Sequence, residues 1–236
     1  MEIPISVEHL RWAMDLSVGT QKQSDSLLLT NPSDNLHVIG TSLSALYQAA
    51  TCHQKCHGGN HILESLAGRT YNLGFASFAL IRQGFYDEAL NLTRSIGEIS
   101  NLILLSVIDK SALKAWLESD AKTRKRNFPP AKIRKILEQH DAPFLATEDW
   151  YSTLYEKYTH VHPGTKPNMH NDSKRPVVGG IFQEEGAETS LSELANALGS
   201  VALVICKYFK FADLFDVIVP HSKVALKSAA TSPDTH

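Results

Sequence analysis

The chain has 236 residues, of which 43% are hydrophobic and 20% charged, with a formal net charge of −2. This balance is typical of a folded globular protein and excludes a global electrostatic attraction to nucleic acid or membranes, so such a partner would need a local patch. Three cysteines, an odd and small number, exclude a disulfide framework and indicate a reducing compartment. We find no secretory signal and no apolar run approaching the ~20 residues of a membrane helix, and we therefore predict a cytoplasmic protein with no membrane contact.

Three successive segments in the first half of the chain carry apolar residues at the helical period. The first runs from Leu36 to about His57 and follows an Asn-Pro-Ser-Asp turn, the second covers 60–82, and the third runs from Tyr86 to Ile108. The second helix contains small residues that would let a neighbouring helix approach closely, namely Ala67, Gly68, Gly74, Ala76 and Ala79. These three segments are predicted core helices.

The chain becomes more polar after Asp109, and shorter helices are predicted over 111–122, 131–140 and 148–160. The basic stretch AKTRKRNFPP, residues 121–130, is predicted to be a break between the first two of these helices, closed by Pro129 and Pro130. Some 25 residues rich in Pro, Gly, Asn and Asp then follow, and a final long helix is predicted from Ser190 to Phe215, capped by Ser190 or Ser192.

These elements together predict an all-α fold, a single helical bundle with a Pro/Gly-rich loop after a His-x-His-Pro stretch. The bundle is expected to form one domain over residues 1–222, built around four helices, and to be followed by a disordered tail over 223–236. The four predicted bundle helices are 36–57, 60–82, 85–108 and 190–215.

The third predicted helix carries a polar stripe on an otherwise apolar surface. Its members Asn91, Arg94, Glu98 and Asn101 recur at i, i+3, i+7 and i+10, and Arg94 and Glu98 are spaced to form an ion pair. Three interpretations stay open: a narrow window on solvent, a buried pair that holds two helices in register, or the lining of a functional pocket. Arg94 and Glu98 are candidate catalytic residues, with Asn101 as a candidate substrate contact.

A second polar cluster lies in YSTLYEKYTHVHPGTKPNMH, residues 151–170. His160 and His162 fall where a helix must end ahead of Pro163, since the residue before a proline avoids the helical region. Histidines there could act as general acid and base near neutral pH, with Tyr158, Lys166 and Asn168 as candidate substrate contacts. Alternatively, one histidine interacts with the helix dipole while the other packs on Tyr158.

Metal binding is an alternative for two groups of residues. His160, His162 and His170 could supply three nitrogen ligands, and CHQKCH, residues 52–57, contains cysteine and histidine pairs four residues apart. Neither group has the second half of a known zinc motif, so the prediction is no metal ligand and no cofactor, with metal binding kept as an alternative.

Helical ribonucleases of the HEPN superfamily use an Arg followed after four to six residues by a His. The segment RKILEQH, Arg134 to His140, has this spacing. Six residues of helix turn by about 600°, so the two side chains diverge by some 120°. The segment is therefore not taken as a motif.

The sequence RSIGE within an apolar helix, followed by YSTLYEKYTHVHP, resembles a bacterial helical family, domain of unknown function 5677. The resemblance spans residues 71–163. Tyr155 stands where that family often has Ser. A more distant likeness to HEPN-type helical bundles is one of fold only. The matching residues are Arg94, Ser95 and Glu98 in the first segment and Tyr151, Leu154, His162 and Pro163 in the second.

The main functional hypothesis is a binding or regulatory module in which these polar residues link helices to the Pro/Gly loop. The alternatives are a metal-independent, HEPN-like ribonuclease of the defence or toxin type, and a metal-binding protein. The expected partner is an RNA or a protein, and the aliphatic helices make a homo-oligomer plausible. The sequence leaves open whether the Arg94–Glu98 stripe meets His160 and His162, which distinguishes chemistry from architecture.

Overall fold

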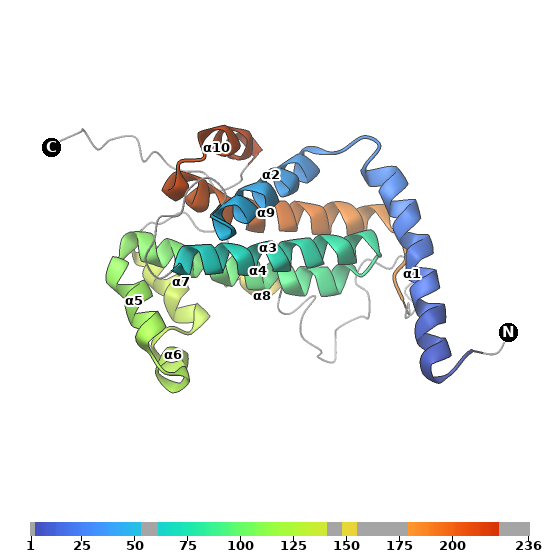
Figure 1. The fold of residues 1–236 in the computed structure, drawn as a ribbon. Helices are drawn as coiled ribbons and strands as arrows, with labels where there is room; N and C mark the ends of the chain where they lie inside the picture. Colours follow the sequence, from blue (N-terminus) through green and yellow to red (C-terminus); the bar gives the residue numbers. More distant parts are fainter. Residues whose placement is uncertain (1–2, 53–60, 141–147, 155–178, 222–236) are drawn as a thin grey trace.

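The structure is a computed structural model, and it describes residues 3–52, 61–140, 148–154 and 179–221. Every regular element within these ranges is helical, which confirms the predicted all-α class (Figure 1). The predicted tail after residue 222, and the loop that was expected to follow the His-x-His-Pro stretch, lie outside the described residues.

Four long helices form the core, as predicted. They are α2 (Asp34–Ala50), α3 (Ile62–Arg82), α4 (Tyr86–Ile108) and α9 (Glu184–Phe209). Both α2 and α4 pack against α3 and α9, and α3 also contacts α9. The largest side chains without solvent exposure in this core are Leu46, Ile81, Leu90, Ile96, Ile103, Leu194, Leu198 and Ile205.

The most deeply buried of these helices is α9. Its apolar residues face α2, α3 and α4, so it needs little polar surface, and Leu194, Leu198 and Val201 are fully buried. Among the described residues it is the one helix long and apolar enough to cross a membrane, and 78% of the stretch in question is buried inside the protein. Burial against three neighbouring helices accounts for its apolar composition.

Close packing of α3 on α9 depends on Gly74, one of the small residues predicted to allow a near approach. A Cβ atom at Gly74 would lie 2.7 Å from Cδ2 of Leu198 and 3.2 Å from Cδ2 of Leu43. Ala67 is also fully buried, whereas Ala76 is exposed. The prediction is therefore confirmed for the face centred on Gly74 and wrong for Ala76.

A smaller helical group covers the carboxyl-terminal end of α4 (Figure 1). It comprises α5 (Lys110–Glu118), α6 (Ala121–Asn127) and α7 (Pro130–Gln139), of which α5 and α7 contact α4. One helix over 111–122 was predicted, followed by a break in the basic stretch. The helix is confirmed as α5 but ends at Glu118, and the predicted break is wrong. Asp120 accepts a hydrogen bond from the Thr123 backbone N–H and starts a separate helix, so the basic stretch is itself helical.

The final predicted helix is also corrected. It begins at Glu184 rather than at Ser190, which is buried within α9 and is not a cap. It ends at Phe209, because Lys210 adopts the left-handed conformation with φ of 62°. A separate α10 (Ala212–Ile218) then folds back onto α9 and α2.

The predicted first core helix ends early. α2 stops at Ala50, so Cys52 lies in a turn after the helix and not on the helical face that was expected to pair it with Cys56. The helix predicted from residue 148 is confirmed as α8 (Glu148–Leu154) over the part that the structure describes. The largest omission is α1 (Ser6–Leu28), a long amino-terminal helix that was not predicted from the sequence.

Candidate functional site

The polar stripe on α4 forms the predicted ion pair. Nη2 of Arg94 lies 3.2 Å from Oε1 of Glu98, and the two side chains are 19% and 33% exposed. Asn91 at one end of the stripe is exposed, whereas Asn101 at the other end is 3% exposed. The stripe therefore runs from the surface into the protein, and its charged pair lies at a window on solvent, one of the three interpretations left open.

The other predicted site residues lie outside the described residues. These are His160, His162, Tyr158, Lys166 and Asn168, and also His170. The described start of this segment, α8, contacts α4, and Nε1 of Trp150 donates a hydrogen bond of 2.7 Å to Glu193 on α9. The chain thus enters the histidine stretch beside the helix that carries Arg94. That the two groups meet stays a prediction.

Arg134 and His140 have the spacing of a ribonuclease motif, but their side chains do not share one environment. Arg134 lies within α7, and His140 follows the end of that helix. Arg134 is 4% exposed, while His140 is exposed to solvent. The structure therefore supports leaving this pair out of the candidate site.

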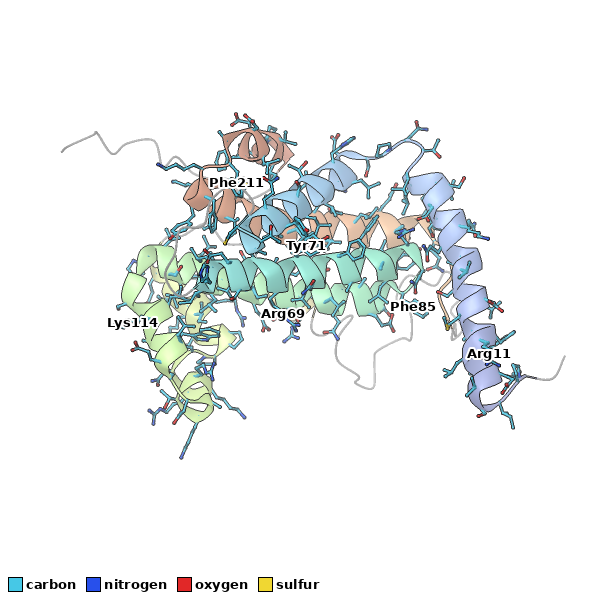
Figure 2. The ribbon with its side chains drawn as sticks, in the orientation of Figure 1. Arg11, Arg69, Tyr71, Phe85, Lys114 and Phe211 are labelled. Carbon is cyan, nitrogen blue, oxygen red and sulfur yellow. The ribbon has the colours of Figure 1, made fainter. Side chains whose placement is uncertain are left out.

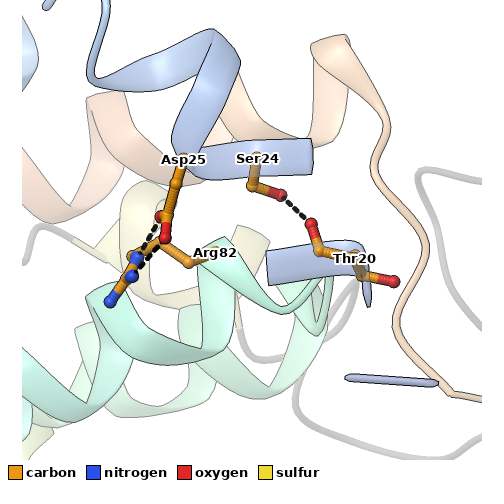
Figure 3. Close-up of polar contacts among 4 residues, drawn as sticks. All are labelled: Thr20, Ser24, Asp25 and Arg82. Carbon is orange, nitrogen blue, oxygen red and sulfur yellow. Dashed lines mark hydrogen bonds and ion pairs between the residues drawn. The ribbon is translucent and has the colours of Figure 1, made fainter. Parts of the chain in front are cut away.

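A second candidate site, which was not predicted from the sequence, is α1. Its carboxyl-terminal half is attached to the bundle by an ion pair between Asp25 and Arg82 of α3, in which Nε and Nη2 each donate to a carboxylate oxygen at 2.5 Å (Figure 3). Thr20 donates a hydrogen bond of 2.9 Å to the Gly180 carbonyl oxygen, and Ser24 is completely buried. We call this attachment the root of α1.

Two glycines allow close contact at this root between α1, the turn from α3 to α4, and the segment that leads into α9. Gly84, in the turn between α3 and α4, has φ of +77° and faces the backbone of Ile181. A Cβ at Gly180 would lie 1.6 Å from the Gln83 carbonyl oxygen, so a side chain there is excluded by backbone atoms. The Tyr86 hydroxyl accepts a hydrogen bond from the Gln183 backbone N–H, and burial raises the Tyr86 pKa. The segment leading into α9 is therefore tightly fitted against the α3–α4 turn.

The amino-terminal half of α1 extends beyond the bundle (Figure 1). Every residue from Ile5 to Leu16 is exposed, and Figure 2 shows side chains there, including Arg11, in open space. Four large apolar side chains lie along one face of this half, and we call them the arm surface. They are Val7, Leu10, Met14 and Val18, which are 50%, 61%, 68% and 47% exposed.

The arm surface continues the face by which α1 is attached at its root. Positions seven residues apart share a helix face, so Val18 aligns with Asp25, and Val7 and Met14 align with Leu28, which packs on the main core. The carboxyl-terminal part of this face of α1 thus packs on the bundle. No described residue covers the amino-terminal part of the same face. The spacing of residues 7, 10, 14 and 18 is visible in the sequence and could have indicated an amphipathic helix.

A cavity of about 570 Å³ opens where α1, α2 and α9 meet. Its apolar wall includes Leu28, Leu36 and Phe182, and Glu184 and Glu188 contribute carboxylates. Neither Arg94 nor Asn101 lines it, so this space is separate from the predicted catalytic stripe.

The ion pair at the root predicts a pH-dependent stability. The hydrogen bonds from Arg82 hold the Asp25 pKa below its ordinary value of 3.8. We therefore expect the pair to stabilise the fold above about pH 4 and this contribution to disappear as the pH falls through the lowered pKa. Asp25→Asn should cost about 1 kcal/mol near neutrality, since both side chains are partly exposed. Urea denaturation of both proteins across this pH range measures the difference, and a gap that persists in acid would contradict the assignment.

The chain was also compared with known proteins. No protein-family model, no curated protein and no solved structure matches it. The resemblance to domain of unknown function 5677 accordingly stays a prediction.

Proposed function

We propose that this protein is a helical binding module that self-associates through α1, with the arm surface of one copy packed against that of a second copy. The observation that carries this proposal is the row of exposed apolar side chains on a helix that extends beyond its own bundle. Contiguous apolar surface of this kind is typical of interaction sites in folded proteins.

The pattern of the arm surface fits a second copy of the same helix. Valines lie at both ends, Val7 and Val18, and the longer Leu10 and Met14 lie between them. A two-fold axis near the middle of this row would pair two antiparallel helices with valine against valine and leucine against methionine. Such an isologous contact uses the same patch on both chains, which is the commonest arrangement in homodimers.

The charges on the exposed half of α1 are compatible with pairing. Glu8, Arg11 and Asp15 follow one strip at spacings of three and four residues beside the arm surface, and they carry two negative charges and one positive charge. Glu8 and Arg11 already form an ion pair at 3.2 Å. Two copies of this helix therefore carry little mutual repulsion, and their polar faces stay in water when the apolar faces meet.

The expected burial is comparable with the cost of association. Full burial of a Val, Leu or Met side chain contributes about 1.5–3 kcal/mol. Because the four side chains are 47–68% exposed, burying what remains of them in both copies contributes roughly 7–14 kcal/mol. Association costs about 4–15 kcal/mol in lost translational and rotational freedom, so the arm surface supports a dimer of moderate stability.

The test is the oligomeric state of the full chain. We expect light scattering during gel filtration to give twice the 26.1 kDa chain mass for the wild type and a single chain mass for the Leu10→Glu/Met14→Glu variant. Both side chains are exposed, so the substitutions should leave helical content and melting temperature unchanged while placing like charges across the contact. Val107→Glu, at a 62% exposed position on α4, is the matched control and should remain a dimer.

Two results would argue against the proposal. A wild type that elutes as a monomer, or a double variant that remains a dimer, would show that α1 does not join two copies. An RNA-cleavage assay on the same samples addresses the ribonuclease alternative. Cleavage by the wild type that is lost in a folded His162→Ala variant would favour the enzyme over the binding module.

A further inference from the structure

Three potential metal ligands converge where α2 is followed by α3. Cys52 lies two residues after α2, His61 is the N-cap of α3, and Glu64 lies in the first turn of α3. The thiol sulfur, a ring nitrogen and a carboxylate oxygen all lie within 4.8 Å of one another. The distance from Nδ1 of His61 to Oε1 of Glu64 is 3.5 Å.

The surroundings of this cluster favour a bound cation. Glu64 is only 8% exposed, and its described ion-pair partner is His61, which is neutral unless protonated. A carboxylate so deeply buried needs a compensating positive charge. Cys52 is half-buried and His61 is exposed, so the cluster is closed on the protein side and open to solvent at the histidine.

The backbone also adopts an uncommon conformation at two of these residues. Cys52 and His61 have φ angles of 52° and 50°, in the left-handed region that residues other than glycine rarely occupy. The structure thus places both donors in a conformation that costs roughly 1–2 kcal/mol in an unconstrained chain. The two residues with this backbone conformation, Cys52 and His61, are also two of the three whose donor atoms lie close together.

We propose that this junction binds a zinc ion through Sγ of Cys52, Nδ1 of His61 and the Glu64 carboxylate. Thiolate, imidazole and carboxylate are the ligand types of protein-bound zinc, whereas magnesium and calcium prefer oxygen ligands alone. Zinc bonds of about 2.0–2.1 Å place two tetrahedral N/O ligands about 3.4 Å apart, close to the separation of His61 and Glu64. Sγ of Cys52 lies within 4.8 Å of the other two donor atoms. A tetrahedral zinc ion holds a sulfur about 3.6 Å from a nitrogen or oxygen ligand, so a side-chain movement of at most about 1 Å completes three-ligand coordination.

Zinc at this position would join the end of one core helix to the start of the next. Because the metal binds the folded chain, saturating zinc should raise the melting temperature, by about 5–10 °C at a hundredfold excess over the dissociation constant. Binding should weaken in acid, since the cysteine must lose its proton and the histidine must be neutral. The site is remote in sequence from α1, and it neither requires nor excludes the proposed dimer.

Cobalt(II) provides a spectroscopic test, because it takes the place of zinc and gives a charge-transfer absorption when a thiolate binds it. We expect the untagged full-length chain, stripped of metal by a chelator, to bind one equivalent of cobalt with this absorption and to release it to zinc. Cys206 is buried in α9, and burial raises its pKa to about 12. Cys56 lies outside the described residues, so Cys56→Ser is tested beside Cys52→Ser. Cys52→Ser should abolish the charge-transfer absorption, and Cys56→Ser should leave it unchanged.

Two further variants separate coordination from folding. His61→Asn keeps a residue that tolerates the left-handed conformation, and Glu64→Gln keeps the side-chain shape. Each should lower zinc affinity by at least about tenfold, the smallest loss usually seen even for outer-shell changes. His140→Asn, at an exposed histidine after α7, is the matched control and should bind normally. Failure of the wild type to bind cobalt or zinc, or unchanged binding in all three ligand variants, would overturn the proposal.

Discussion

Replacing Gly180 with alanine should destabilise this protein more than the same replacement at Gly74 or Gly179. The new Cβ would lie 1.6 Å from the Gln83 carbonyl oxygen and 2.7 Å from its carbonyl carbon. Because these are backbone atoms at the end of α3, no change of rotamer can relieve the overlap, and the segment before α9 must move away. We expect a loss of about 3–5 kcal/mol, at the high end for single substitutions.

The same substitution should loosen α1, because Thr20 donates its hydrogen bond to the Gly180 carbonyl oxygen. Hydrogen exchange should therefore become faster at the root of α1 than in α2. Gly179→Ala is the adjacent control, since its φ of +83° is unfavourable for alanine but no atom lies within 4 Å of the added Cβ. It should cost about 1–2 kcal/mol. Equal losses at the two positions would show that the close approach at Gly180 does not matter.

The contact between Gly74 and Leu198 predicts a compensating pair of substitutions. Leu198→Ala removes a fully buried side chain and should cost about 2–5 kcal/mol through lost burial and the cavity that remains. Its removal also takes away the atom that lies 2.7 Å from a Cβ at Gly74. Adding Gly74→Ala to this variant should therefore recover about 1–2 kcal/mol, by filling part of the cavity and by raising helix propensity.

A control separates packing from propensity in this experiment. Gly40 lies within α2, is exposed, and has no atom within 4 Å of an added Cβ. Gly40→Ala should give only the propensity gain of about 0.5–1 kcal/mol, and the same gain in both backgrounds. Chemical denaturation of the single and double variants measures the coupling between residues 74 and 198. Zero coupling would contradict the contact between α3 and α9.

The ion pair on α4 was predictable because it is local. Residues four apart on a helix lie on the same face, so Arg94 and Glu98 could be paired from their spacing alone. Their degree of exposure was not predictable in this way. It depends on which neighbouring helices cover the stripe, and the buried position of Asn101 shows how sharply that cover changes over a single turn.

The metal cluster shows why part of the candidate chemistry could not be predicted. The cysteine-histidine segment was expected to continue the first core helix, with ligands four residues apart. Because α2 ends at Ala50, Cys52 does not lie on that helix and cannot pair with a ligand four residues on. No sequence motif connects His61 and Glu64 with Cys52, although the three side chains lie close together. Their proximity results from how the chain turns between two packed helices.

The sequence by itself determined the all-α class and the positions of the core helices, because the 3.6-residue period of apolar side chains is a local property of each segment. It also indicated that α3 has small residues for close packing, although it did not distinguish Gly74, which lies in the contact, from the exposed Ala76. Only the tertiary structure decided that Gly74 meets Leu198, that Gly180 meets the α3–α4 turn, and that the arm surface of α1 extends beyond the cover of its own bundle. These features depend on contacts between residues far apart in the chain, which periodicity within one helix does not specify.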